Sequence, residues 1–188
     1  AATNGPRHDA TASREPTRTA RPTAMSGDDG GLGTIGVLSP GEMGTSIART
    51  VSANGLRVVT TLTGRSDETR ANAEAAGIED VGSHEAVVRE ADLVLSVVPS
   101  DVVHEVARAV AAGAEAAGET ALLAEMNAIA PSTVEAIAEE VDEAVDVVDG
   151  CIIGPAADLS RAVFNFSGPR AEAAAALEDF GLTTRVLG

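Results

Sequence analysis

Residues 34–44 read TIGVLSPGEMG, and this stretch decides the fold class. A short β-branched and apolar run ends in the turn Ser39-Pro40-Gly41, and a helical pattern begins at Glu42. A strand, a tight turn and a helix N-terminus together form a receptor for a dinucleotide pyrophosphate. Unpaired N–H groups and the positive end of the helix dipole stabilise phosphate charge there. The alternative is an ordinary glycine-containing turn after a strand.

The glycines of this turn match part of a known fingerprint. Gly41 and Gly44 stand three apart, as the last two glycines of GxGxxG do. We expect one to let the backbone approach phosphate closely and the other to let the helix pack on the strand. Ser39 occupies the first glycine position, so the fingerprint is partial.

The composition suits a parallel sheet covered by helices. The chain has 188 residues, which is enough for one domain with a real core. Hydrophobic residues make up 44% of it, and its only aromatic residues are three Phe. The core must therefore be built from Ala, Val, Leu and Ile, as in sheets buried on both faces.

The charge balance excludes two classes of partner. The formal net charge is −16, and all 13 basic residues are Arg, because the chain has no Lys. Nucleic acids and anionic membranes both need a basic surface, so neither is expected as a partner. Dispersed acids favour a protein kept soluble in a very salty cytoplasm, as in halophiles; the alternative is an acidic protein from a high-GC genome.

A single cysteine, Cys151, excludes an internal disulfide and indicates a reducing, cytoplasmic compartment. We expect it to be a small buried apolar residue rather than a nucleophile. No apolar run is long enough to span a membrane, and no secretory hydrophobic segment is present near the N-terminus.

The N-terminal segment differs from the rest of the chain. Residues 1–24 are rich in Thr, Ala, Arg and Pro and show no hydrophobic period. We predict a disordered extension over residues 1–30 and one folded domain over 31–188. Met25 resembles a natural start, which would make the preceding residues a mis-assigned start; the alternative is a basic targeting or interaction arm.

From residue 34 the chain alternates between strand-like and helix-like segments. The predicted strands are 34–38, 57–62, 78–81, 92–98, 120–125, 145–148, 162–167 and 182–187. The predicted helices are 42–53, 66–76, 83–90, 100–117, 131–140 and 169–180. This alternation implies right-handed βαβ crossovers, and so an α/β, Rossmann-like, doubly wound and mostly parallel sheet with helices on both faces.

The loop after the second strand favours a phosphorylated ribose. NAD-binding domains place an acid at the end of that strand, but no Asp or Glu lies between Thr45 and Ser66. Gly64, Arg65 and Ser66 follow instead, and a guanidinium and a hydroxyl can bind a 2′-phosphate. This predicts NADP over NAD; the alternative is a surface loop whose serine only caps the next helix.

Two further strand ends carry candidate ligand contacts. Residues 91–99, ADLVLSVVP, are nearly all apolar and end at the edge where open α/β sheets bind ligands. Val98 and Pro99 are either core and turn residues or a wall of the nicotinamide site. Asn127 follows the strand at 120–125 and is either a hydrogen-bond partner for a carboxamide or substrate, or a turn former.

The remaining polar residues form no recognisable centre. The histidines, His8, His84 and His104, lack metal-ligand spacing, and no metal site is expected. His84 and His104 stand beside Glu85 and Glu105 on predicted helices, where we expect them to be solvated. We expect the same of Asp142, Glu143 and Asp146.

Four motifs occur in order: GVLSPGEMG, the GRS turn, ADLVLSVVPS and EMNAIAPST. Together they resemble the NADP-binding domain of the 6-phosphogluconate dehydrogenase and 3-hydroxyisobutyrate dehydrogenase superfamily. Within it the sequence looks most like oxidoreductases that carry a DUF1932 C-terminal domain, where a PGEMG turn is typical. The resemblance covers about residues 34–188.

The resemblance implies positions for the ligands. It places the cofactor on Leu38, Ser39, Pro40, Gly41, Glu42, Met43, Gly44, Gly64, Arg65, Ser66, Val98, Pro99, Ser100 and Asn127. It places the substrate-binding stretch on residues 149–155, so Ile153 and Gly154, with Asn127, are the candidate substrate contacts. Ile153 stands where the family usually has a serine, which puts its ordinary 3-hydroxy acid substrate in doubt.

The resemblance also implies parts that this chain lacks. The family's catalytic lysine lies in an all-α C-terminal domain that dimerises, and the chain contains no lysine. We therefore expect a cofactor-binding fragment of an enzyme that transfers hydride between NADP(H) and a small hydroxy-acid or carbonyl substrate. The alternatives are a dinucleotide-sensing module without chemistry and an imine or pyrroline reductase.

Overall fold

The computed structural model describes residues 31–141 and 143–187. Within them, one sheet of eight strands has the order β3-β2-β1-β4-β5-β6-β7-β8. The strands are β1 (Thr34–Leu38), β2 (Arg57–Thr60), β3 (Glu79–Asp80), β4 (Leu93–Ser96), β5 (Ala121–Glu125), β6 (Val145–Ile153), β7 (Val163–Ser167) and β8 (Thr184–Leu187). The predicted extension over residues 1–30 lies outside the described residues, as do His8 and Asp142.

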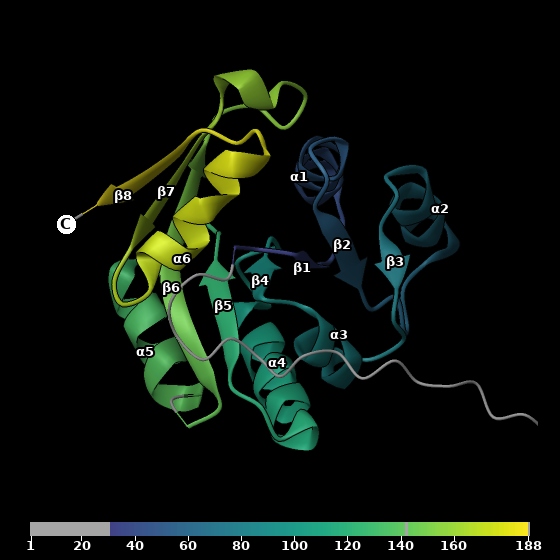
Figure 1. The fold of residues 1–188 in the computed structure, drawn as a ribbon. Helices are drawn as coiled ribbons and strands as arrows, with labels where there is room; N and C mark the ends of the chain where they lie inside the picture. Colours follow the sequence, from purple (N-terminus) through teal and green to yellow (C-terminus); the bar gives the residue numbers. More distant parts are fainter. Residues whose placement is uncertain (1–30, 142, 188) are drawn as a thin grey trace, which may run out of the picture.

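Six α-helices and two 3-10 turns connect these strands. They are α1 (Glu42–Ala53), α2 (Asp67–Ala75), α3 (His84–Glu90), α4 (Val103–Ala117), α5 (Pro131–Val141), α6 (Ala171–Ala175), η1 (Leu159–Arg161) and η2 (Ala176–Phe180). Helices α3, α4 and α5 lie on one face of the sheet, and α1 and α6 lie on the other (Figure 1).

The topology is doubly wound. Strands β1 to β6 pair in parallel in the order 3-2-1-4-5-6, which confirms the Rossmann-like fold class. The strand order reverses between β1 and β4, and ligands of such sheets bind in the crevice at that switch point, outside the carboxyl ends of the strands.

Local sequence explains where the helices begin and end. Helix α1 has the predicted bounds, 42–53. Ser66 and Ser83 cap α2 and α3 by accepting hydrogen bonds from the N–H groups of Thr69 and Ala86. Pro131 opens α5, as its fixed φ favours in a first turn.

Three expectations about the C-terminal third were wrong. The strand predicted over 145–148 continues to Ile153, because residues 149–153 pair antiparallel with β7. The single helix predicted over 169–180 is a short α-helix, α6, followed by the 3-10 turn η2. Cys151, expected to be buried, is only partly buried and stands opposite Asn165 in β7.

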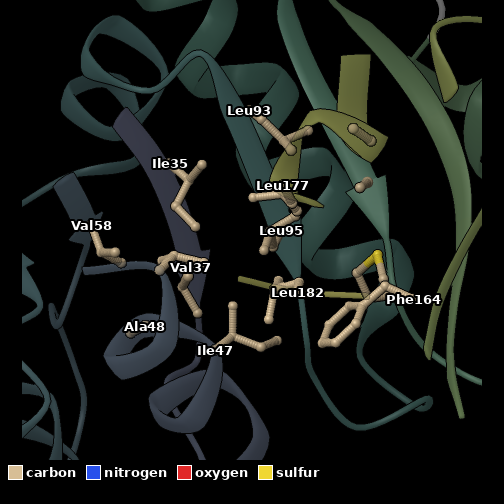
Figure 2. Close-up of a cluster of buried hydrophobic side chains, with 14 of the residues drawn as sticks. Ile35, Val37, Ile47, Ala48, Val58, Leu93, Leu95, Phe164, Leu177 and Leu182 are labelled. Carbon is tan, nitrogen blue, oxygen red and sulfur yellow. The ribbon is translucent and has the colours of Figure 1, made fainter. Parts of the chain in front are cut away.

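Two apolar layers enclose the sheet. One lies between the sheet and the face covered by α1 and α6, and Figure 2 shows Ile35, Val37 and Leu95 of the central strands meeting Ile47 and Leu177 there. The other lies between the sheet and α3, α4 and α5. Aliphatic side chains dominate both layers, as the composition predicts.

Candidate functional site

The turn after β1 keeps the backbone of the glycine fingerprint although it begins with serine. Ser39 has φ of 54°, a left-handed conformation that a glycine adopts without strain. The Gly41 N–H donates to Ser39 O at 2.7 Å and closes the turn. A serine in this conformation, where a glycine is favoured, marks the turn as a candidate functional position.

The two glycines of this turn have different surroundings. A Cβ on Gly44 would stand 3.1 Å from Val37 Cγ1, so Gly44 lets α1 pack closely on β1, as predicted. A Cβ on Gly41 would meet only Ser39 O, at 3.9 Å. No side chain caps α1 at Gly41, so the first N–H groups of the helix have no acceptor from a cap.

The loop after β2 meets this turn. The Arg65 guanidinium donates from Nη2 to Ser39 Oγ at 2.5 Å, which links residues 26 positions apart. The loop after β2 is fixed to the segment at and after β3 by two hydrogen bonds. Thr63 Oγ1 donates to Gly82 O at 2.7 Å, and Leu62 N–H donates to Asp80 Oδ1 at 3.1 Å. Arg65 is therefore presented at the turn by an anchored loop.

A cavity of about 260 Å³ opens between the turn, this loop and the helices α3 and α4. Its lining residues are Leu38, Ser39, Thr61, Thr63, Gly64, Arg65, His84, Glu105 and Val106. Four of the residues predicted to bind cofactor, Leu38, Ser39, Gly64 and Arg65, therefore share one cavity.

Thr61 has an unsatisfied hydroxyl in this cavity wall. The residue is 7% exposed, and its Oγ1 has no hydrogen-bond partner among the described residues. A buried hydroxyl without a partner costs free energy, and this oxygen is itself not accessible from the cavity.

His84 corrects an expectation. It was predicted to be solvated, but it is half-buried and lines the cavity. Burial lowers the pKa of His84, and the nearby positive charge of Arg65 lowers it further. Added negative charge beside Arg65 would act in the opposite direction and raise this pKa.

His104 lies apart from this cavity, on the outer surface of α4. Its Nδ1 is 2.9 Å from Glu140 Oε2, and Arg108 also pairs with Glu140. The hydrogen bonds from His104 and Arg108 lower the pKa of the Glu140 carboxyl. This cluster joins α4 to α5.

The carboxyl ends of β4 and β5 are tied together by Asn127. Its Oδ1 accepts a hydrogen bond from Val98 N–H at 3.0 Å, and its Nδ2 donates to Ser96 O at 3.3 Å and to Glu125 Oε1. Asn127 therefore bonds both to the end of the neighbouring strand β4 and to Glu125 of its own strand. Pro99 and Ser100 follow Val98 and are exposed.

Glu125, the last residue of β5, was not singled out from the sequence. Its side chain is fully buried, and its Oε2 has no hydrogen-bond partner among the described residues. Burial raises the pKa of this carboxyl, the nearby polar side chains of Ser96 and Asn127 oppose the rise, and the charge of Asp149 adds to it.

Replacing Glu125 with Gln is expected to stabilise the protein at alkaline pH. The folded-state pKa of Glu125 is raised, so the unfolded chain loses this proton first as the pH rises. The stability of the wild-type protein therefore falls as the pH rises from the unfolded-state pKa to the folded-state pKa. The gain should be about 1 kcal/mol at about pH 8, near the usual cost of an unsatisfied buried group, and should shrink toward the unfolded pKa. Urea unfolding of both proteins across this pH range measures it; a gain that does not change with pH would contradict the assignment.

The candidate substrate residues lie beyond this edge. Asp149 stands level with Glu125, and β6 continues four residues past it, which is about 13 Å of strand. Ile153 is 65% exposed at its end. Gly154 has φ of 148°, and a Cβ there would lie 2.4 Å from Ala162 Cα, so packing alone already requires glycine.

The other predicted contacts lie in or next to the turn after β1, apart from Ser66, which lies at the start of α2. Pro40 and Gly44 are buried, Met43 packs partly against the core, and Glu42 is exposed in the first turn of α1. Ser66 accepts the capping bond from Thr69 at 3.2 Å.

The sequence analysis did not predict a site role for four cavity residues and one residue at the strand edge: Thr61, Thr63, Glu105, Val106 and Glu125. Only Glu125 carried a signal, as an acid inside the apolar run ALLAEM. Among the described residues, no cluster of three or more His, Cys, Asp or Glu side chains could hold a metal ion. None of the described helices combines the length and apolar content needed to cross a bilayer.

Comparison with solved structures finds the same fold in oxidoreductases. A conserved protein of unknown function, described as structurally similar to 3-hydroxyacid dehydrogenases, aligns with a TM-score of 0.72 and 26% identity over 82% of this chain and 57% of its own. The imine reductase of Streptomyces aurantiacus aligns with a TM-score of 0.67 and 23% identity over 82% of this chain and 55% of its own. The imine reductase of Myxococcus stipitatus, solved with NADP+, aligns with a TM-score of 0.64 and 19% identity over 82% of this chain and 55% of its own.

The chain thus spans little more than half the length of these proteins. A search of curated proteins gave no match. The family model for the NAD-binding domain of 6-phosphogluconate dehydrogenase matches residues 33–180, most of the chain. With the strand order and the turn at Ser39, this match shows that the chain belongs to the 6-phosphogluconate dehydrogenase family of NAD-binding domains.

Proposed function

We propose that this chain binds NADP(H), in preference to NAD(H), as the cofactor domain of a hydride-transfer oxidoreductase. The observation that carries the proposal is the Arg65 guanidinium bonded to Ser39 at the mouth of a cavity that both residues line. The cavity residues fit the adenosine half of a dinucleotide, and the open space at Gly41 fits a pyrophosphate.

Each group in the cavity has a separate task in this proposal. The α1 N-terminus receives the pyrophosphate, since its first N–H groups have no capping side chain. Thr61 directly follows β2, near the strand end where NAD-binding domains place an acid, and forms part of the wall beside the ribose. Arg65 and Ser66 bind the 2′-phosphate, because a guanidinium forms strong charge-assisted bonds with phosphate oxygens.

The nicotinamide end follows at the neighbouring strands. Residues 98–100 and Asn127 form the wall beside the nicotinamide, and Ile153 and Gly154 approach the substrate. When bound, the cofactor supplies the hydride. A lysine-type acid/base outside this chain exchanges the substrate proton, because the chain has no lysine.

The substrate class has two candidates. A small hydroxy acid or carbonyl compound follows from the family and from the neighbour described as similar to 3-hydroxyacid dehydrogenases. An imine is the second, because several solved structures with this fold are imine reductases. Profiling of hydroxy acids and cyclic imines with a protein that also contains the catalytic domain separates them.

The net charge of the chain leads us to propose its cellular environment and to exclude one class of partner. A net charge of −16 suits a salt-rich cytoplasm and makes nucleic acid an unfavourable partner. We also propose that the whole protein is a homodimer formed through the all-α domain that the resemblance implies.

Replacing Gly41 with Ala is expected to weaken NADP+ binding about tenfold while leaving stability unchanged. The φ of Gly41 is −76°, which alanine adopts freely, and the added methyl finds open space in the free protein. With cofactor present, the same methyl would stand where the pyrophosphate must approach. Calorimetric titration measures the affinity, and thermal unfolding without ligand measures the stability.

Gly44→Ala is the matched control for this test. Its methyl would press on Val37 in the free protein, so it should lower the melting temperature. If folded Gly41→Ala binds NADP+ as tightly as the wild-type protein does, the pyrophosphate does not bind at this turn.

A further inference from the structure

A row of polar side chains crosses the carboxyl edge of the sheet. Ser96, Glu125 and Asp149 stand in register on three neighbouring strands, at the ends of the two parallel ladders that join them, so their side chains point to the same face. Ser96 and Glu125 are fully buried, and Asp149 is partly buried. The row lies on the face that is covered by α3, α4 and α5.

The two oxygens of Glu125 have unequal surroundings. Its Oε1 accepts hydrogen bonds from both the backbone N–H, at 3.2 Å, and the side-chain amide of Asn127. Its Oε2 reaches hydrogen-bond geometry with no atom of the described residues, and neither does the neighbouring Ser96 Oγ. A neutral carboxyl suits this site, with the proton on Oε2 and the acceptor role left to Oε1.

This carboxyl helps to fix how Asn127 is oriented. An amide can turn its oxygen or its nitrogen either way, but only the Nδ2 end can donate to the two acceptors on this side, Glu125 Oε1 and the Ser96 carbonyl. The Oδ1 end is then aimed at Val98 N–H, 3.0 Å away. Glu125 therefore reaches the turn after β4 through a single intermediate side chain.

We propose that Glu125 is a positioning residue for the nicotinamide half of the cofactor site. It holds Asn127, and Asn127 holds the backbone of residues 98–100, which would wall the nicotinamide. This inference rests on the proposed function for its ligand. It adds a buried residue to the site that touches neither cofactor nor substrate.

The test compares two ligands on matched variants by calorimetric titration. The ligands are NADPH, which occupies both halves of the site, and adenosine 2′,5′-bisphosphate, which occupies only the half near Arg65. Glu125→Met keeps the approximate length of the side chain without an acceptor. Glu125→Gln keeps the acceptor oxygen.

Glu125→Met should weaken NADPH binding about tenfold and leave the bisphosphate affinity unchanged. Glu125→Gln should restore NADPH affinity, since its amide oxygen accepts the same bonds. Asn127→Ala should cause the same selective loss, and adding Glu125→Met to it should cost nothing more, because both act through one link.

Two results would overturn the inference. If folded Glu125→Met loses affinity for both ligands equally, Glu125 stabilises the fold in general and does not position the nicotinamide half. If its NADPH affinity is unchanged, Glu125 has no role in the cofactor site. A wild-type protein that binds neither ligand would instead contradict the proposed function. If Glu125→Met does not fold, failure of Glu125→Gln to keep wild-type NADPH affinity overturns the inference equally.

Discussion

Replacing Arg65 with Asp is expected to weaken NADPH binding about 100-fold and to leave NADH binding within about threefold of wild type. The loss combines the charge-assisted bonds of the guanidinium with repulsion between the new carboxylate and the 2′-phosphate. NADH carries a hydroxyl at that position, and a carboxylate accepts hydrogen bonds from ribose hydroxyls in NAD-binding domains. The variant therefore reverses the cofactor preference.

A control variant separates the local role of Arg65 from the effect of the protein's total charge on cofactor affinity. Arg49→Asp makes the same change on an exposed position of α1, outside the cavity lining. It should shift NADPH and NADH affinities equally and slightly. Calorimetric titration of both cofactors into both variants checks the prediction, and an equal loss of NADPH and NADH in Arg65→Asp would refute the 2′-phosphate role.

Replacing Gly113 with Val is expected to lower the free energy of unfolding by about 3 kcal/mol, at the upper end of typical overpacking costs. A Cβ at Gly113 would lie 2.8 Å from the His84 carbonyl carbon and 2.9 Å from Glu85 N. These are backbone atoms at the start of α3, so the helix must shift as a whole. Because His84 lines the cavity, the same shift should also weaken cofactor binding.

Ala112→Val is the matched control, since it places the same β-branched residue on the exposed side of the same helix. Its expected cost is about 0.5 kcal/mol, from helix propensity alone. Urea unfolding of both variants measures the difference. Equal destabilisation would show that α3 and α4 do not depend on close backbone approach at Gly113.

The fold class could be predicted because hydrophobic runs and capping residues agree along the chain. Strand β1 and helix α1 have the predicted bounds, and the serine caps of α2 and α3 are local features of sequence. The length of β6 could not be predicted, because it depends on antiparallel pairing with β7, a partner that follows in the chain. The break between α6 and η2 likewise interrupts a run of alanines that gave no local stop signal.

The candidate site was only partly visible in the sequence. Ser39 and Arg65 stand in recognisable turns, and the structure brings them into contact. His84 could not be placed, because its exposure is decided by how α3 packs on α4 rather than by its polar neighbours. Thr61 and Glu125 became candidates only through burial without full hydrogen bonding, which is a property of three-dimensional packing.

The most direct test of the central claim is a titration of NADPH, and then of NADH, into the protein in concentrated KCl. The fluorescence of the reduced cofactor is the readout, and the absence of Trp and Tyr from the chain keeps that signal clean. The account predicts saturable binding of one cofactor per chain, with NADPH bound more tightly than NADH. Absence of saturable binding by either cofactor to the folded protein would contradict it.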